Sequence, residues 1–198
     1  MKKLSNYFLL IIFASSVLAS CKKEPVETPT EGKTITVNAT SDEEWTYFSF
    51  ETGDVITVTD PATDKNWDLG FLRSHIRTNS GTSGSAQGGA YDKGVVDFDS
   101  VTEAPTSDFD IDVDDEVTQI NMTTYQYEPI SANAVLETWG EFDDSTPPIY
   151  HPSNKIFVVK TASGKYAKIH VKAYSNESGT GNITFEYKYQ ADGTTNLK

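Results

Sequence analysis

The chain has 198 residues, a formal net charge of −13 and a single cysteine. Its acidic excess disfavours a nucleic-acid partner, because the phosphate backbone repels a negatively charged protein. A lone cysteine excludes any disulfide within one chain, so the fold must depend on its apolar core. Aromatic residues make up 12% of the sequence, which supplies the large side chains that such a core needs.

The N-terminus has the layout of a secretory signal. Two lysines precede an apolar run over residues 8–13, which is too short to span a bilayer. The sequence Leu-Ala-Ser-Cys that ends at Cys21 resembles the bacterial lipobox, in which cleavage precedes a cysteine that receives a diacylglycerol. We therefore expect residues 1–20 to be a lipoprotein signal peptide and Cys21 to be lipidated. Removal of the two lysines takes the formal net charge from −13 to −15. Secretion as a soluble chain with an incidental cysteine is the alternative.

Residues 21–32 hold prolines, charges and almost nothing to bury, which predicts a flexible tether. One domain is expected over residues 33–198, since this length is close to the commonest domain size. Apolar and polar residues alternate with a period of two along much of it, which is typical of strands. In its first half, strands are predicted at residues 34–37, 45–50, 55–58 and 67–73.

Residues 79–89 have no apolar side chain larger than alanine. They must form either a surface loop or a backbone segment that approaches another closely. Further along, carboxylates occupy alternate positions of residues 108–116, a spacing that could supply oxygen ligands to calcium. Phe109, Ile111 and Val113 fill the positions between them, which favours a strand with one buried and one solvated acidic face.

One helix is expected over residues 132–139, capped by Ser131 and ended by Gly140. Beyond it, the runs 156–160, 166–174 and 183–189 alternate and are separated by turn residues, which predicts an antiparallel meander. Ile169, Val171 and Ala173 should then face the core, whereas Lys168, His170 and Lys172 should face water. The sequence thus predicts an all-β fold of mostly antiparallel strands with one or two short helices.

Catalysis finds little support in the sequence. Residues 81–85 lack the glycine spacing of a nucleophile elbow, and neither a phosphate-binding loop nor a histidine pair at zinc spacing is present. We therefore expect a binding protein and not an enzyme.

Four side chains of the mature chain carry imidazole or thioether groups that could bind a metal. His75 and His170 stand beside basic residues, so a solvated role is expected for both. Met122 follows a strand-like stretch and could be either core filler or a ligand. His151 belongs to residues 143–153, a segment with three prolines that could hold an imidazole in a rigid, exposed loop.

Several motifs follow one another along the domain in a recognisable order. These motifs are Trp45–Phe50 with Gly53, Trp67–Arg73, Arg77–Gly81 with Gly88–Ala90, Asn154–Lys160, Tyr166–Ile169 and Gly181–Tyr189. Their order, their spacing and their position behind a lipobox resemble the HmuY family of haem-binding lipoproteins. The resemblance covers nearly the whole mature domain.

The resemblance implies a surface-exposed, lipid-anchored haemophore of the outer membrane, which carries haem as cargo in iron acquisition and passes it to a TonB-dependent receptor. Haem would lie between two projecting loops, its iron held by two axial histidine or methionine side chains. Met122 and His151 fall in the matching regions, and thioether and imidazole are both established haem ligands. Side chains expected near the porphyrin are Tyr125, Tyr127, Trp139, Phe142, Ile149 and Tyr150.

Several alternatives stay open. For the axial ligands, a single side chain, or a pair of histidines that uses His75 or His170, could replace Met122 and His151. For the cargo, a metal-free porphyrin could replace haem. For the function, the alternative is a surface module that binds glycans or a protein partner. Convergence of Met122 and His151 on one apolar cleft would favour haem, whereas exposed aromatic residues on an open polar groove would favour glycans.

Overall fold

A computed structural model describes residues 32–145 and 149–198 of this protein. Its larger sheet has five antiparallel strands in the order β1-β13-β12-β11-β6. They are β1 (Lys33–Asn38), β6 (Gly89–Asp92), β11 (Phe157–Lys160), β12 (Tyr166–Asn176) and β13 (Gly179–Gln190). A second sheet has the order β3-β2-β4-β5, with β2 (Thr46–Ser49), β3 (Asp54–Ile56), β4 (Leu69–Leu72) and β5 (His75–Thr78).

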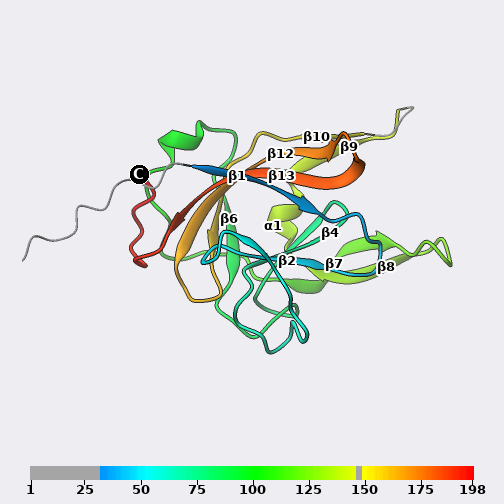
Figure 1. Ribbon diagram of the computed structural model, residues 1–198, viewed down its shortest axis with the longest axis horizontal. Helices are drawn as coiled ribbons and strands as arrows, with labels where there is room; N and C mark the ends of the chain where they lie inside the picture. The colour runs from blue at the N-terminus through cyan, green and yellow to red at the C-terminus, as the bar shows by residue number, and fades with distance from the viewer. Residues whose placement is uncertain (1–31, 146–148) are drawn as a thin grey trace, which may run out of the picture.

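Two further strand pairs lie outside both sheets (Figure 1). One is the hairpin of β7 (Val113–Ile120) and β8 (Tyr127–Ala132), and the other pairs β9 (Gly140–Asp143) with β10 (Ile149–Pro152). The only helical turns in the described residues are η1 (Phe98–Ser100) and α1 (Ala134–Glu137). Mostly antiparallel strands with two short helices are the fold class that the sequence predicts, and this prediction is confirmed.

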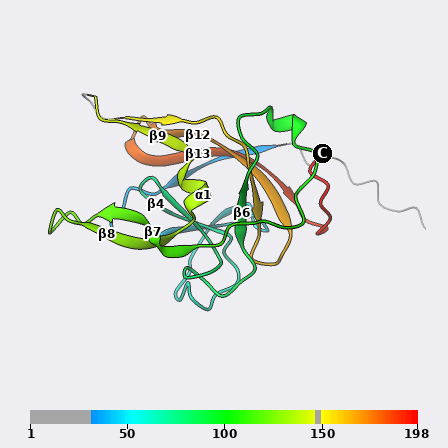
Figure 2. The same ribbon diagram turned by 180° about the vertical axis from the view of Figure 1, so that it is seen from behind.

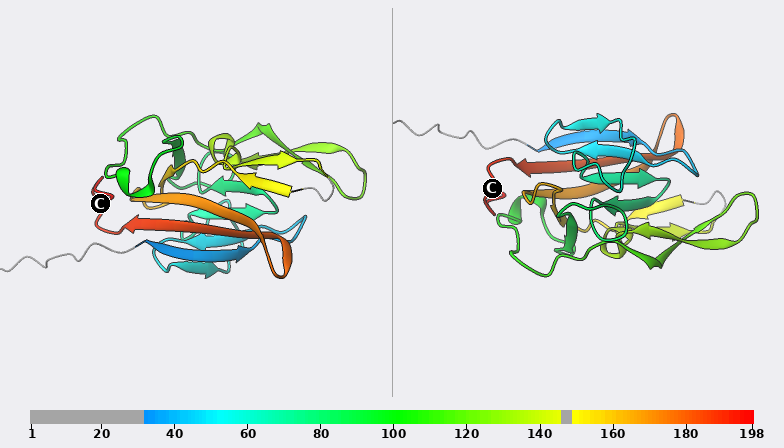
Figure 3. Two further views of the ribbon diagram at one scale, coloured as in Figure 1. Left: turned by 90° about the horizontal axis from the view of Figure 1, so that it is seen from above. Right: turned by 90° about the horizontal axis from the view of Figure 1, so that it is seen from below.

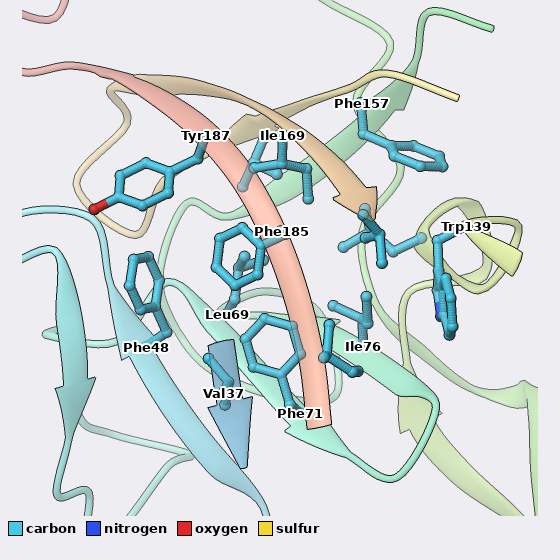
Figure 4. Packing of buried hydrophobic residues seen from close by; sticks show 14 of the residues in the cluster. Val37, Phe48, Leu69, Phe71, Ile76, Trp139, Phe157, Ile169, Phe185 and Tyr187 are labelled. Carbon is cyan, nitrogen blue, oxygen red and sulfur yellow. The ribbon is translucent and has the colours of Figure 1, made fainter. Parts of the chain in front are cut away.

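The core lies between the two sheets, where alternate side chains of each strand face inward. Phe185 of β13 is fully buried and meets Phe48 of β2 edge-on, with 5.3 Å between ring centroids. The same ring stacks on Phe71 of β4 at 5.5 Å. Figure 4 shows these rings with Leu69 and Ile76, and shows Trp139 closing the core beside α1. Aromatic contacts of this kind join the sheets into one domain.

The predicted C-terminal meander is confirmed, because β11, β12 and β13 pair antiparallel in chain order. Ile169 and Val171 are buried as expected. Ala173 is only half-buried, which corrects its predicted place in the core. The register of β12 shifts between Val171 and Ala173, so that the next residue, Tyr174, is buried in its place.

Lys168 contradicts the sequence prediction of a water-facing side chain. It does point to the outer face of the larger sheet, but η1 and the chain after it cover that face at this end (Figure 2). Only 1% of Lys168 is exposed, and its Nζ donates hydrogen bonds to the carbonyl oxygens of Phe98 at 2.8 Å and Val101 at 2.9 Å. Burial lowers the pKa of this ammonium group.

The predicted helix is also shorter than expected. Asn133, not Ser131, caps it, because the Asn133 side chain accepts a hydrogen bond from the Leu136 N–H. Ser131 belongs to β8, and Gly140 begins β9 instead of following a helix end. One buried residue, Leu136, attaches this single turn to the core.

The acidic run does not keep the expected alternation. Asp112 is buried at 1% exposure, whereas Ile111 is 56% exposed. The Asp112 carboxylate accepts hydrogen bonds from the N–H of Thr78 at 2.8 Å, the Thr78 hydroxyl at 2.6 Å and the Asn133 amide at 3.0 Å. It thereby joins β5 to the turn that caps α1, and burial raises the pKa of its carboxyl.

The glycine-rich segment makes the close backbone approaches that the sequence allowed. A Cβ atom on Gly81 would overlap the carbonyl oxygen of Asp112, and one on Gly88 would come within 2.7 Å of the Asn79 carbonyl oxygen. Glycine is therefore required at both positions, because the chains pass too close for a side chain.

Candidate binding site

Both hairpins, β7–β8 and β9–β10, extend from the same end of the molecule, opposite the C-terminus (Figures 1 and 3). They also carry most of the large apolar side chains that the described residues expose to water. These are Ile120, Met122, Tyr125 and Tyr127 on β7–β8, and Phe142 and Ile149 on β9–β10. Exposed apolar residues gathered in one region are typical of a binding surface. This end is therefore the candidate site.

Met122 lies in the turn of β7–β8, where Asn121 shapes the backbone. The Asn121 side-chain oxygen accepts hydrogen bonds from the N–H groups of Thr123 at 2.9 Å and Thr124 at 3.1 Å. Its carbonyl oxygen accepts a third from Tyr125, whose φ of 56° is left-handed. The turn leaves Met122 54% exposed at the tip. Met122 is thus not core filler, which was one of its two predicted roles.

The same hairpin is fixed to the body of the domain by a contact close to its turn. Gln119 of β7 donates a side-chain hydrogen bond to the carbonyl oxygen of Asp42 at 2.9 Å. Asp42 belongs to the loop between β1 and β2, so the hairpin is braced by a loop of the two main sheets. The tip extends beyond this contact.

His151 lies in strand β10 and not in the exposed loop that its prolines suggested. In the ladder it pairs with Glu141, and its Nε2 lies 3.4 Å from a carboxylate oxygen of Asp143. Hydrogen bonds from Ser145, and in smaller part the contact with His151, lower the pKa of Asp143. Two of the three prolines, Pro147 and Pro148, lie outside the described residues.

The opposite face of this ladder continues the core. Tyr150 stacks on Trp139 with ring centroids 5.5 Å apart, and it contacts Phe142 at 5.1 Å and Tyr174 at 4.9 Å. Trp139 is buried at 2% exposure and donates from Nε1 to the carbonyl oxygen of Ser74. Trp139 is therefore a core residue and does not belong to the exposed pocket. Because side chains alternate along a strand, His151 faces away from Tyr150.

Two surface hollows lie at this end. The first, of about 190 Å³, is the Met122 hollow, and it is lined by Asp42, Glu43, Gln119, Ile120, Asn121, Met122, Thr123, Glu128, Pro129 and Ile130. The second, of about 490 Å³, is the Tyr150 hollow, lined by Arg73, Phe142, Ile149, Tyr150, Tyr174, Ser175 and Thr180. Its volume falls within the range of about 300–1,000 Å³ that is usual for small-molecule sites.

The hollows adjoin through one ion pair. Arg73, from the turn between β4 and β5, lines the Tyr150 hollow, and its Nε lies 3.2 Å from Asp42, which lines the Met122 hollow. His151 lines neither hollow. The structure thus brings the two hairpins to one end but does not bring Met122 and His151 into a shared cleft, which was the criterion that the sequence analysis set.

The other two histidines are both partly buried, which corrects the solvated role that the sequence predicted for them. His75 Nδ1 lies 2.8 Å from a carboxylate oxygen of Glu137, and only 14% of its side chain is exposed. His170 sits on β12 beside Lys172, and burial, with a smaller effect of Lys172, lowers the pKa of its imidazole. A bis-histidine site that used either residue would need a different arrangement of these strands.

Sequence reasoning missed the roles of three residues of this site. Arg73 ends the Trp67–Arg73 motif, but nothing in that motif pairs it with Asp42, because the two residues meet only where the β4–β5 turn and the β1–β2 loop converge. Ile120 was also missed, although its place at the end of β7 just before the turn is visible in the strand pattern. Within the described residues, no helix is long and apolar enough to cross a membrane.

Several solved structures are similar to this chain. No curated protein matches the chain. A Bacteroides vulgatus protein described as HmuY-like and heme-binding shares 28% identity at a TM-score of 0.64, over 81% of this chain and 92% of its own. A Bacteroides fragilis protein described as a lipoprotein shares 28% identity at a TM-score of 0.61, over 80% of this chain and 89% of its own.

A Tannerella forsythia protein described as an apo HmuY analog shares 27% identity at a TM-score of 0.62. That match covers 80% of this chain and 95% of the other. The family model for the HmuY protein matches residues 41–187, which span both hairpins and both sheets except β1 and the last three residues of β13. The chain belongs to the HmuY family.

Proposed function

We propose that this chain binds haem between the β7–β8 and β9–β10 hairpins and performs no catalysis. The observation that carries the proposal is the concentration of exposed apolar side chains on two hairpins that extend from one end. A porphyrin is a flat apolar plate, and burial of apolar surface contributes about 25 cal/mol per Å². Family membership and the heme-binding Bacteroides vulgatus relative support the same ligand.

Met122 is the first proposed axial ligand. Its thioether stands at the tip of β7–β8 and is 54% exposed, so it can reach an iron atom between the hairpins. Tyr125 and Tyr127 of the same hairpin are 70% and 74% exposed. Their rings would cover one part of the porphyrin, as the sequence analysis expected.

His151 is the second proposed ligand, and it must move to act. Its imidazole faces away from the Tyr150 hollow and contacts Asp143. The ladder of β9 and β10 is only four residue pairs long and lies outside both sheets. A two-stranded ladder of this kind is marginally stable alone, but a twist that turns His151 inward would also disturb the packing of Tyr150 on Trp139 and Tyr174, so the bond to iron must offset that loss. Phe142, Ile149 and Tyr150, which line the Tyr150 hollow, are proposed to cover the other part of the porphyrin.

In the cell, the proposed role is that of a lipid-anchored haemophore of the outer membrane, which delivers haem to a TonB-dependent receptor. The signal peptide at residues 1–20, the lipidated Cys21 and the tether at residues 21–32 are part of the same proposal, with the domain over residues 33–198. Residues 1–31 lie outside the described part of the chain. The Bacteroides fragilis relative described as a lipoprotein supports the anchor.

The test is a visible-absorption titration with haem, in the ferric and the reduced state, of a chain that spans residues 22–198. This chain keeps every contact described above. We expect a saturable six-coordinate spectrum that Met122→Ala and His151→Ala each alter, while the control Val95→Ala, at an exposed apolar residue just before η1 and outside both hairpins, keeps it. No saturable change in either state would reject haem and leave the glycan- or protein-binding alternative.

A further inference from the structure

Arg73 occupies a backbone conformation that disfavours its side chain. It lies in the two-residue turn between β4 and β5 with a φ of 52°, in the left-handed region that glycine adopts most easily. The turn itself is well fixed, because the Arg73 N–H donates to the carbonyl oxygen of Ala39 at 2.8 Å. Non-glycine residues in this strained conformation concentrate at functional sites, so the position of Arg73 points to a role for its side chain.

The guanidinium group is held at the junction of the two hollows. Its Nη1 donates a hydrogen bond to the carbonyl oxygen of Thr40 at 3.0 Å, and its Nε pairs with Asp42. Nη2 donates no hydrogen bond to the residues that the structure describes. The Arg73 side chain is 33% exposed, so a ligand in the Tyr150 hollow can reach it.

Charge makes this group distinctive. Among the described residues that line the two hollows, Arg73 is the only cation, whereas Asp42, Glu43 and Glu128 are acidic. The whole chain has a net charge of −13. An anionic ligand is therefore repelled by most of this surface and attracted at one point. The planar fork of arginine is also suited to a carboxylate.

We propose that Arg73 binds a propionate carboxylate of the porphyrin, an inference that rests on the proposed haem function. The contact sets the orientation of the ligand. The carboxylate edge of the porphyrin lies toward the body of the domain, where the β1–β2 loop and the β4–β5 turn meet. The apolar edge lies toward the hairpin tips, where Tyr125, Tyr127 and Phe142 are exposed.

The test compares haem with its dimethyl ester, in which both propionate groups are uncharged, and each porphyrin is titrated against the chain of residues 22–198. We expect the wild type to bind the diacid about tenfold more tightly than the ester, the gain of one charge-assisted hydrogen bond. Arg73→Gln should abolish this preference, and Arg73→Lys should keep part of it. Asp42→Asn should increase the preference, since it frees Arg73 from its carboxylate partner. Lys172→Gln removes an exposed cation of β12 that pairs with Glu186 and serves as the matched control.

The outcomes separate the two proposals. Equal affinity of the wild type for diacid and ester, or a preference that survives Arg73→Gln, would overturn the role of Arg73 and leave haem binding intact. Binding of neither porphyrin would overturn both. The wild-type comparison needs no variant, so a folding defect in Arg73→Gln would not weaken the test.

Discussion

Replacement of Asp112 by alanine should destabilise the domain strongly. Its carboxylate accepts three close hydrogen bonds, two from Thr78 and one from Asn133, and the residue is 1% exposed. Asp112→Ala would leave these three buried donors without their acceptor. Each unsatisfied buried donor costs about 1 kcal/mol or more, so the free energy of unfolding should fall by about 3 kcal/mol.

Urea denaturation, followed by tryptophan fluorescence, measures this loss. With a slope of about 2 kcal/mol per molar urea, a loss of about 3 kcal/mol lowers the unfolding midpoint by about 1.5 M. Asp114→Ala is the matched control, because Asp114 is an exposed carboxylate close by in the same segment, and its effect should stay within about 0.5 kcal/mol. Equal midpoints for the two variants would refute the view that Asp112 anchors β5 to the α1 cap.

Three other substitutions test separate parts of the fold. Lys168→Ala should lower the free energy of unfolding by about 2 kcal/mol, because the carbonyl oxygens of Phe98 and Val101 lose their buried donor. In the same urea assay, the control Lys172→Ala, at an exposed residue, should lower it by less than about 0.5 kcal/mol. Gly84→Ala should lower the thermal midpoint, since the new Cβ would overlap the Asn79 side chain and overpacking costs about 1–3 kcal/mol; an unchanged midpoint would contradict the packing. His170→Gln should flatten the pH dependence of stability below pH 6.5. Burial lowers the pKa of His170 in the folded state below the ordinary value of 6.5 that applies to the unfolded chain. As the pH falls below 6.5, the unfolded chain therefore takes up the proton first, and the free energy of unfolding decreases. Urea midpoints measured between pH 7 and pH 5 check this prediction. If the midpoint changes with pH equally in the variant and the wild type, the prediction is wrong.

Seven of the nine strands of the two sheets could be predicted from sequence because apolar and polar residues alternate along much of their length, whereas β5 and β6, of four residues each, were missed. The C-terminal meander was clearest, since turn residues separate its three runs. Lys168 shows the limit of such reasoning. Alternation places Lys168 correctly on the outer face of the sheet, but a segment about 70 residues earlier in the chain covers that face. The local sequence pattern around Lys168 does not show that a distant segment packs over it.

The same limit explains the acidic run. Asp112 looks like a solvated carboxylate in sequence, yet donors from residues 78 and 133 converge on it in the fold. Hydrogen-bond partners so distant in sequence have no signature in the spacing of nearby residues. The short helix was misplaced for a related reason, because Ser131 and Asn133 are both good caps and the pairing of β8 decides between them.

For the candidate site, sequence reasoning found the two segments but not their geometry. Met122 was placed correctly near a strand end, and five of the six residues expected near the porphyrin lie on the hairpins. Trp139 was assigned to the pocket and belongs to the core, because its ring closes the space between the sheets. The side of the ladder on which His151 falls depends on the register of β9 with β10, which the proline-rich segment does not reveal.

Hydrogen–deuterium exchange with and without haem tests the central claim most directly, since it reports which backbone segments the ligand protects. The account predicts slower exchange in residues 113–132 and 140–152, and in the turn that holds Arg73. The β2–β3 turn and residues 161–165, which lie away from the hairpins, should be unaffected. Saturable haem binding that protects only one hairpin, or neither, would contradict a site between them.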